Sequence, residues 1–498
     1  MRKIILGIVV FVTGASVMVT EIVASRILAP YIGTSIIVWT SLIGVILGGL
    51  ALGYYWGGRL ADKAGSYFLL RNILFLASVY IFGVSQASGY LLTRLIEANA
   101  DIRISSLVSS LTLFLPPTIL LGMVIPFAVA LSLKEVNKAG RVAGGLYALS
   151  TLGSILGTFW CGFFLLADIG SIKILVLISL LLILIAILLN FAAEKAKTLW
   201  FLILLSAALL FVFIAAGAKV KEEGLLLDTD TLYSRVIIKA GREPETGRET
   251  IELTKGRFIE SYAYTQGDDL FGYYNYYDLA SIFNPELSRV LMIGGAGFVY
   301  PKHFLKTLPK TLLDVVELDP AMLELAEEYF GFTPNPTLQV YHEDARTYLN
   351  STQKKYDALL IDVFDSDITL PFQLTTVEVI KKYYEALTPK GVLIVNIIGQ
   401  IEGEEGEFLR SEYLTYLQMF PFVELYPISD AKDGSRIQNI MLVATKNKQE
   451  EISKDARIAA MLGHRWEKTI EGKAIILTDD FAPVEQMMAK RTRWDYLY

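Results

Sequence analysis

Long apolar runs dominate the first 218 residues of this 498-residue chain. A helix that crosses a bilayer needs about 20 mostly apolar residues, because lipid offers no partner to an exposed backbone N–H or C=O. Seven runs meet or approach this length: Ile4–Thr20, Ile36–Trp56, Leu69–Leu91, Ser106–Leu133, Val142–Leu166, Ile174–Phe191 and Leu199–Ala216. The sequence therefore predicts a multi-span helical domain over residues 1–218 in the cell membrane, with the lipid bilayer as its partner. Its fourth span is expected to kink at Pro116-Pro117.

Glycine spacing indicates how these helices pack. Gly49, Gly53 and Gly57 lie four residues apart in the second run, and Gly153 and Gly157 repeat that spacing in the fifth. Small residues at this interval let helix backbones approach closely in lipid. We therefore expect two close helix–helix contacts at these glycines.

The N-terminus is also similar to a signal peptide, since Met1-Arg-Lys precedes the first apolar run. No small-x-small cleavage site follows the run, and Glu21 and Arg26 come directly after it. We therefore expect an uncleaved first helix.

The composition changes sharply near Lys219. Residues 1–218 carry 14 Lys+Arg and 7 Asp+Glu, whereas the remainder carries 31 Lys+Arg and 44 Asp+Glu, a net charge of −13. That acidity argues against nucleic acid as a partner and suits cationic ligands. The single Cys161 and the scattered His303, His342 and His464 offer no pattern for a metal site.

The C-terminal half shows two successive patterns. From about Leu225 to Ser281 it is β-like, which predicts a small β subdomain over residues 219–285. Over residues 286–498, apolar strand candidates alternate with helical stretches, which predicts a mostly parallel sheet covered by helices. The strand candidates are Val290–Ile293, Leu312–Val316, Leu338–Tyr341, Ala358–Ile361 and Val392–Ile397.

A glycine-rich turn follows the first of these strands. It contains Gly294, Gly295 and Gly297, and Glu317 comes about twenty residues later at the end of the next strand. Glycines let the backbone pass close to a ligand, and a strand-end acid at this spacing can accept both hydroxyl hydrogens of a ribose. The pattern predicts a nucleoside-binding enzyme.

Further acids follow the next two strands. Asp344 comes after the third strand, and Asp362 and Asp365 come after the fourth. Each alone is as readily a helix N-cap or an ordinary loop acid. Ligands collect at the carboxyl ends of parallel strands, and acids at successive strand ends favour a site there. The aromatic run 271–277 is mainly a candidate for core packing, with one or two of its tyrosines lining a pocket or binding an amine.

These motifs resemble the spermidine synthase family of aminopropyltransferases. The N-terminal half resembles the multi-spanning segment fused to some bacterial and archaeal members, through Glu21, Arg26-Ile-Leu-Ala-Pro-Tyr-Ile-Gly33, Trp39 and Gly57-Gly-Arg-Leu-Ala-Asp62. The resemblance implies a Rossmann-like α/β domain of the class I methyltransferase type. It also implies a co-substrate, either S-adenosylmethionine or its decarboxylated form, and a small amine or polyamine as acceptor. No metal is implied, and a homodimer is an open possibility.

The resemblance also implies roles for individual residues. The co-substrate would contact the glycine-rich turn, Glu317 would hold its ribose, and Asp344 with Ala345 its adenine. Asp362 and Asp365 would be catalytic and hold the amine. Tyr273, Tyr274 and Glu260 would line the substrate site. By this reading a neutral amine attacks the carbon beside the sulfonium, and methylthioadenosine leaves.

The chain departs from the family at the glycine-rich turn. The family has an aspartate there that binds the amino end of the decarboxylated donor, and Gly297 stands at that position. The family's Tyr-His-Glu segment is also replaced by Tyr273-Tyr-Asn275, and its usual glutamine near Glu260 is absent. Without the aspartate, free N–H groups in the turn are expected to attract the carboxylate of intact S-adenosylmethionine.

Three readings of function stay open. The first is an aminopropyltransferase. The second is a lyase or methyltransferase that uses S-adenosylmethionine. The third is a transporter or sensor whose C-terminal domain binds a nucleoside or polyamine without chemistry.

The side of the membrane is also open. Ten of the 14 basic residues of the N-terminal half fall at one end of the predicted bundle: Arg2, Lys3, Arg59, Lys63, Arg71, Lys134, Lys138, Arg141, Lys195 and Lys197. The loops at the other end carry fewer. Loops rich in Lys and Arg stay in the cytoplasm. Seven spans from a cytoplasmic N-terminus would put the C-terminal half outside the cell, whereas its nucleoside substrate favours the cytoplasm.

Overall fold

The computed structural model describes residues 2–489 apart from 99–100, 134, 167–168, 193–223, 245, 256–257, 268, 364–370 and 449–454. The chain divides into two compact units. One contains Met1–Glu223 with Thr229–Arg235, and the other contains Gly224–Asp228 with Val236–Tyr498. The boundary predicted between residues 218 and 219 falls outside the described residues, and the predicted domain limits stay predictions.

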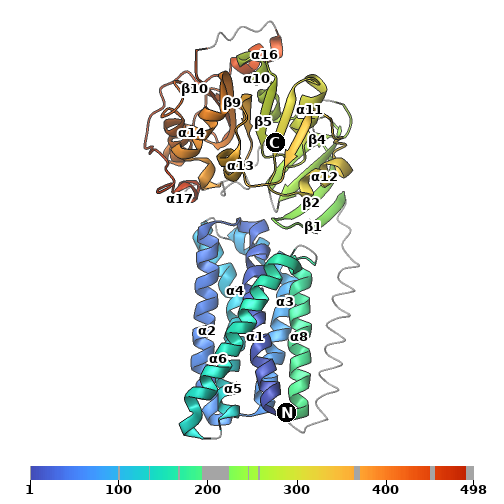
Figure 1. Ribbon diagram of the computed structural model, residues 1–498, viewed down its shortest axis with the longest axis vertical. Helices are drawn as coiled ribbons and strands as arrows, with labels where there is room; N and C mark the ends of the chain where they lie inside the picture. The colour runs from blue at the N-terminus through green and yellow to red at the C-terminus, as the bar shows by residue number, and fades with distance from the viewer. Residues whose placement is uncertain are drawn as a thin grey trace. The chain divides into compact units, whose positions relative to one another are not determined.

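The first unit is a bundle of long helices (Figure 1). Its elements are α1 (Arg2–Ile32), α2 (Ile36–Ala64), α3 (Tyr67–Ala98), α4 (Ile102–Gly122), α5 (Val124–Ser132), the 3₁₀ turn η1 (Val136–Lys138), α6 (Ala139–Trp160), the π-helical η2 (Cys161–Leu165) and α8 (Ser171–Ala192). Within the described residues, six helical segments are long and apolar enough to cross a membrane, with α4 and α5 together forming one of them. They coincide with the first six predicted spans, and the seventh, Leu199–Ala216, lies outside the described residues.

The fourth span is interrupted after its prolines. α4 continues through Pro116 and Pro117, and the interruption lies at Met123, between α4 and α5. Because Pro116 has no N–H, the carbonyl of Thr112 lacks its usual helical donor. The Tyr80 hydroxyl of α3 donates to that carbonyl at 2.7 Å. A neighbouring helix therefore satisfies the backbone group that the proline leaves free.

The glycine contacts predicted from spacing are present. A Cβ added at Gly53 of α2 would lie 2.3 Å from the Ile119 carbonyl oxygen of α4. A Cβ added at Gly153 of α6 would lie 2.0 Å from the Phe11 carbonyl oxygen of α1. Real Cβ atoms do not approach backbone atoms this closely, so glycine sets the distance between the helices in both pairs.

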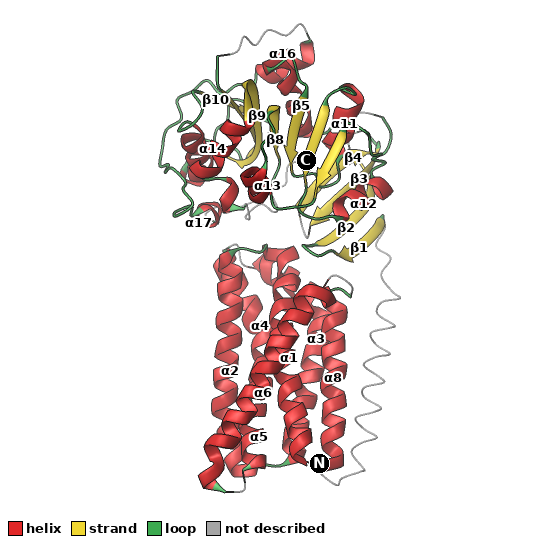
Figure 2. Cartoon of the chain, in the orientation of Figure 1, coloured by secondary structure: helices red, strands yellow, loops and turns green. Residues whose placement is uncertain are grey.

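Two β-sheets follow in the chain (Figure 2). The first is a four-stranded sheet of order β1-β2-β3-β4, formed by β1 (Leu225–Asp230), β2 (Arg235–Arg242), β3 (Glu249–Lys255) and β4 (Phe258–Tyr264). The second has seven strands in the order β10-β11-β9-β8-β5-β6-β7. These are β5 (Arg289–Ile293), β6 (Leu312–Val316), β7 (Leu338–Tyr341), β8 (Tyr356–Ile361), β9 (Leu387–Gly399), β10 (Phe422–Pro427) and β11 (Gln438–Thr445).

The five strands predicted from the sequence form the parallel part of the large sheet, which confirms the predicted α/β fold. The sequence analysis did not identify β10 and β11, which add an antiparallel edge beside β9. Antiparallel strands at an edge are common additions to such sheets.

Alternate side chains of each strand enter two different cores. On β5, Leu291 and Ile293 pack with α13 (Ala345–Ser351), α14 (Val377–Ala386), α15 (Glu407–Tyr416) and α17 (Val484–Met488). Val290 and Met292 pack on the opposite face with η3 (Gly272–Leu279), α10 (Ala280–Phe283), α11 (Val299–Thr307), α12 (Ala321–Tyr329) and α16 (Ala456–Leu462). The short turns η4 (Phe372–Leu374) and η5 (Glu404–Gly406) complete the unit. Because both faces are covered, the central strands are mostly apolar.

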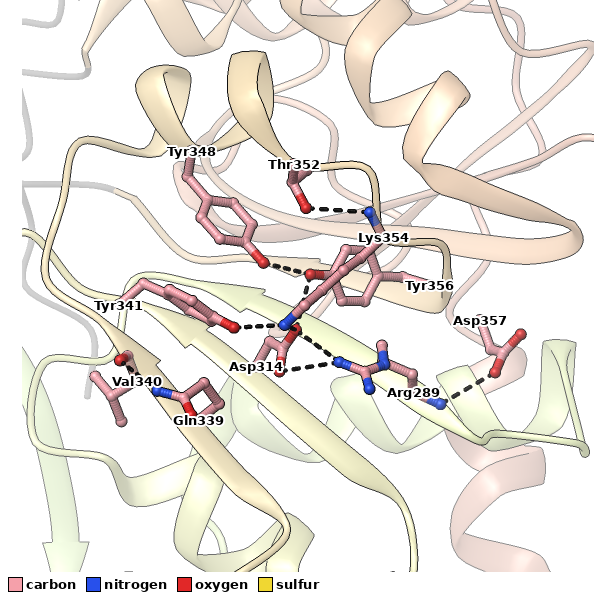
Figure 3. A network of polar contacts seen from close by, with 10 residues as sticks. All are labelled: Arg289, Asp314, Gln339, Val340, Tyr341, Tyr348, Thr352, Lys354, Tyr356 and Asp357. Carbon is pink, nitrogen blue, oxygen red and sulfur yellow. Dashed lines mark hydrogen bonds and ion pairs between the residues drawn. The ribbon is translucent and has the colours of Figure 1, made fainter.

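A buried polar network joins the beginnings of β5 and β8 to β6 (Figure 3). The Asp314 side chain of β6 is 2% exposed. It accepts hydrogen bonds from the Tyr356 hydroxyl at 2.8 Å, Lys354 Nζ at 2.8 Å and Arg289 Nη1 at 3.2 Å. A buried carboxylate is tolerated when donors replace its water, so this network fixes the end of the sheet opposite the glycine-rich turn.

The α2–α4 contact gives a test of glycine packing. We expect Gly53→Ala to lower the stability of the helical unit by about 1–3 kcal/mol, because the added methyl group overpacks against the α4 backbone. Gly48→Ala is the matched control, because a Cβ at Gly48 meets nothing within 4 Å and both changes gain the same helix propensity. Thermal unfolding of the full chain in detergent measures the effect. Equal melting temperatures for the two variants would contradict the packing.

Candidate active site

The order in which the chain adds strands to the large sheet reverses between β5 and β8. From β5 the chain continues to β6 on one side, and it later returns to β8 on the other side of β5. The glycine-rich turn follows β5, and Asp362 directly follows β8. The carboxyl ends of two parallel strands that diverge in this way form a crevice where α/β proteins bind ligands.

Gly294 is required at this point by two constraints. It has a φ of +89°, and a Cβ on it would lie 1.8 Å from the Asp362 carbonyl oxygen. Its N–H donates to the Val316 carbonyl at 2.9 Å, and the Asp362 N–H donates to the Ile293 carbonyl at 2.8 Å. The turn and the acid after β8 are therefore held against each other by the backbone.

Ala296 and Phe298, which follow Gly294 in the turn, both have an unfavourable backbone conformation. Ala296 has a φ of 41° and Phe298 a φ of 52°, in the left-handed region that non-glycine residues rarely adopt. Such strain persists where the surrounding structure enforces it, and it is concentrated at functional sites.

The Glu317 carboxylate accepts hydrogen bonds from the backbone of the glycine-rich turn. The Glu317 side chain is 7% exposed. One oxygen accepts from the Gly295 N–H at 2.8 Å and the Ala296 N–H at 3.0 Å, and the other accepts from the Asp319 N–H at 3.0 Å. An ionised carboxylate has about four acceptor positions, so Glu317 retains capacity for a ribose hydroxyl. That role stays a prediction.

The expectation that the turn offers free N–H groups to a substrate carboxylate is wrong for three of its residues. Glu317 accepts from Gly295 and Ala296, and the Gly297 N–H donates to Ser261 Oγ at 2.8 Å. A Cβ at Gly297 would lie 2.9 Å from Ser261 Cβ. The space that the family's aspartate would need is therefore filled by Ser261.

A cavity opens at this edge of the sheet. It is lined by Phe258, Ile259, Glu260, Ser261, Tyr262, Phe271, Gly272, Tyr273, Tyr274, Met292, Gly294, Gly295, Ala296, Tyr300, Asp362, Asn396, Ile398, Ile428, Ser429 and Asn439. Six predicted site residues belong to this set: Glu260, Tyr273, Tyr274, Gly294, Gly295 and Asp362. Gly297, Glu317, Asp344 and Ala345 are described but do not line it, and Asp365 lies outside the described residues.

Asp362 is the ionisable group at the centre of this arrangement. Its Oδ2 accepts from the Tyr273 hydroxyl at 2.9 Å, and its Oδ1 accepts from Asn396 Nδ2 at 3.1 Å. The protein around the carboxylate removes much of its hydration. This desolvation raises the pKa of Asp362 to about 6, against the opposing effect of hydrogen bonds from Asn396 and Tyr273.

Aromatic side chains form one wall of the cavity. The rings of Tyr273 and Tyr274 lie 4.4 Å apart, and those of Tyr262 and Phe271 lie 4.6 Å apart. Burial, with a further contribution from the Asp362 charge, raises the pKa of Tyr273 well above its ordinary value, so its phenol stays neutral. A neutral aromatic wall beside a carboxylate suits a cation with an apolar chain.

Two other acids have clear structural partners. Asp344 is the N-cap of α13, and its Oδ1 accepts from the Thr347 N–H at 3.0 Å. Glu260 lies 3.8 Å from Lys255 Nζ. Asp344 is therefore a helix N-cap, as the alternative interpretation of this acid predicted. The role of Asp344 and Ala345 in binding adenine stays a prediction.

The sequence analysis missed Asn396 and Asn439. Both line the cavity, and Asn439 Nδ2 donates to Asn396 Oδ1 at 2.9 Å. A signal was present for Asn396, because it is a lone polar residue in the apolar run 392–398. No comparable signal marks Asn439, because β11 was not identified as a strand.

Comparisons with known proteins place this chain beside characterised families. Residues 277–418 match the family model described as the spermine/spermidine synthase domain. The chain is 28% identical over 247 residues to a polyamine aminopropyltransferase of Vibrio vulnificus, covering 46% of this chain and 80% of that protein. It is 32% identical over 136 residues to the human eEF1A lysine and N-terminal methyltransferase, covering 24% of this chain and 20% of that protein.

Among solved structures, a probable spermidine synthase from Corynebacterium glutamicum matches with a TM-score of 0.40 and 20% identity. The match covers 56% of this chain and 98% of that one.

The C-terminal unit has an α/β fold with a mostly parallel sheet, and its matches to the synthase domain and to the aminopropyltransferase indicate a transferase. More narrowly, this part of the chain contains a spermine/spermidine synthase domain.

Glu317 gives a test of nucleoside binding at this edge. We expect Glu317→Ala to weaken binding of methylthioadenosine by about 10- to 150-fold, which corresponds to loss of a charge-assisted hydrogen bond of about 1.5–3 kcal/mol. Titration calorimetry on the full chain measures the affinity. Glu327→Ala is the control, since Glu327 is exposed on α12. Unchanged affinity in Glu317→Ala would exclude the assignment.

Proposed function

We propose that the C-terminal unit transfers an aminopropyl group from an adenosyl sulfonium donor to a small amine and releases methylthioadenosine. The observation that carries the proposal is the placement of Asp362 between the glycine-rich turn and the aromatic wall. A nucleoside at the turn and an amine at the wall would meet at that carboxylate.

The proposed chemistry is a direct displacement. The neutral amine nitrogen donates its lone pair to the carbon beside the sulfonium, a C–N bond forms, and the C–S bond breaks with its electrons going to sulfur. Methylthioadenosine leaves as a neutral thioether. The nitrogen then loses a proton to Asp362.

The chain's own residues contribute mainly position. Orientation of two reactants can contribute on the order of 7–11 kcal/mol. Tyr273 and Asn396 hold the two carboxylate oxygens of Asp362, and the raised pKa of about 6 brings this acid closer to the ordinary ammonium value of about 10. Asp362 is therefore a better proton acceptor than an ordinary surface aspartate.

A second candidate is a reaction of intact S-adenosylmethionine, either methyl transfer or internal cleavage. The favouring observation is Gly297, which leaves the turn without the acid that would repel a carboxylate. The similarity to a methyltransferase over 136 residues points the same way. The occupied N–H groups of the turn weigh against a carboxylate site there.

We further infer that the six long helices cross the cell membrane. Within the helical unit, the N-terminus and the α2–α3 and α5–α6 connections lie at one end of the bundle (Figure 1). These are three of the four regions whose basic residues predict a cytoplasmic face.

Product analysis distinguishes the candidates. The full chain is incubated with each donor, with and without putrescine as the amine. We expect methylthioadenosine only with an amine present. Methylthioadenosine without an amine would indicate a lyase, and S-adenosylhomocysteine would indicate methyl transfer. If no product forms, the domain would bind its ligand without catalysing a reaction.

Replacing Asp362 tests its role in turnover. Asp362→Asn keeps the shape but removes the proton acceptor, so we expect methylthioadenosine release to fall by about 10²- to 10⁴-fold. Asp433→Asn, in an exposed loop, is the matched control. Near-normal release by Asp362→Asn would remove Asp362 from the mechanism.

The rate should also depend on pH. Asp362 accepts a proton only when ionised, so its contribution is lost as pH falls through a pKa of about 6. We expect kcat/KM to decrease roughly tenfold per pH unit below that value. A profile that stays flat down to pH 4.5 would contradict the assignment.

A further inference from the structure

Three polar side chains form a row across adjacent strands beside the cavity. Asn439 belongs to β11, Asn396 to β9, and Asp362 follows β8. Asn439 Nδ2 donates to Asn396 Oδ1 at 2.9 Å, and Asn396 Nδ2 donates to Asp362 Oδ1 at 3.1 Å. We call these residues the amide row.

The amide row has a fixed direction. An ionised carboxylate only accepts hydrogen bonds, so Asn396 must present its NH₂ group to Asp362. The carbonyl oxygen of Asn396 then faces Asn439, which must present its own NH₂ group. The orientation of both amides is therefore set by the charge on Asp362 and secured by Asn439.

The two oxygens of Asp362 consequently differ. A proton on Oδ1 would face the NH₂ group of Asn396, and a flip of Asn396 would bring two NH₂ groups together at Asn439. Oδ2 faces the Tyr273 hydroxyl, a group that can either donate or accept a hydrogen bond. A proton is therefore accommodated at Oδ2 and excluded from Oδ1.

We propose that Asn439 is a positioning residue that acts through Asn396 to make Oδ2 the proton-accepting oxygen of Asp362. The proposal rests on the proposed function for the identity of the proton donor, the substrate amine. The protonation site itself is a property of the amide row and Tyr273, whatever the reaction.

Packing alone does not explain the amide row. Asn396 is 3% exposed in a strand that is otherwise apolar around it, and burying an amide costs free energy that a leucine would not. The buried carbonyl oxygen of Asn396 accepts from Asn439, and the NH₂ group of Asn396 donates to Asp362. The pair is thus matched to a charged partner, and Asp362 is that partner.

The other ionisable groups near Asp362 do not take over the role of the amide row in stabilising the ionised carboxylate. Tyr274 and Tyr277 approach from η3, Tyr300 from α11 and Glu260 from β4. The Tyr277 hydroxyl donates to the Ile361 carbonyl at 3.0 Å. Among the described residues that line the cavity there is no Lys or Arg, so hydrogen bonds are the main stabilisation of the ionised form there.

The test follows Asp362 directly by infrared difference spectroscopy of the full chain in detergent, with Asp362→Asn identifying its carboxyl band. In Asn439→Leu, Asn396 is free to turn and its bond to Oδ1 weakens. We expect the titration midpoint of Asp362 to rise by about one pH unit, because a bond to the charged form is lost. The C=O band of the protonated form should move to higher wavenumber, because that oxygen is Oδ1.

Asn447→Leu is the matched control. Asn447 follows β11, and its amide donates to the Pro389 carbonyl at 2.9 Å, away from the cavity. In Asn447→Leu, the titration midpoint and the C=O band of Asp362 should equal those of the parent protein. If Asn439→Leu does not fold, Asn439→Ala serves instead, since it adds no charge and cannot donate to Asn396.

The outcomes separate this proposal from the proposed function. An unchanged midpoint in the Asn439 variants would overturn the amide row, even if the parent releases methylthioadenosine. A C=O band that responds to Tyr273→Phe and not to Asn439→Leu would place the proton on Oδ1 and also overturn it. A shifted midpoint in a chain that releases no methylthioadenosine would leave the amide row standing and reject the transfer reaction.

Discussion

The backbone contact between Gly294 and Asp362 is the constraint on which the site depends. With the Asp362 carbonyl 1.8 Å from the position of a Cβ, no side chain fits at residue 294. Parallel pairing of β5 with β8 brings the two segments together. Glu317 then holds the following N–H groups, and the strained conformations of Ala296 and Phe298 follow from that fixed path. The glycine-rich turn, the acid and the aromatic wall therefore form one rigid assembly, which favours a reaction that needs precise placement.

The sequence predicted the parts of the fold that depend on periodicity. Apolar length identified the six described spans, and alternation of strands and helices identified β5 to β9. Glycine spacing identified two helix contacts, because in lipid a close approach needs small residues. The break in the fourth span at Met123 was not predicted, because the local pattern marked only Pro116 and Pro117, and α4 continues through both prolines.

The site was predictable only in part, for a similar reason. Strand-end acids and glycines can be counted along the chain, and Asp362, Gly294 and Gly295 line the cavity as expected. The state of each group depends on neighbours from distant segments. Ser261 of β4 occupies the space beside Gly297, and Asn439 of β11 faces Asn396 of β9. Neither pairing follows a local pattern, so the expected carboxylate site in the turn was wrong and the amide row was missed.

The pairing of helices in the first unit has a consequence for biosynthesis. The most extensive contacts join α2 with α4, α1 with α6 and α3 with α8, and none of these pairs is consecutive in the chain. α1 is synthesised long before α6, so the small-residue surface of α1 around Gly14 lacks its α6 partner until α6 has been made. The three main helix pairs can therefore be complete only after α8 has been made.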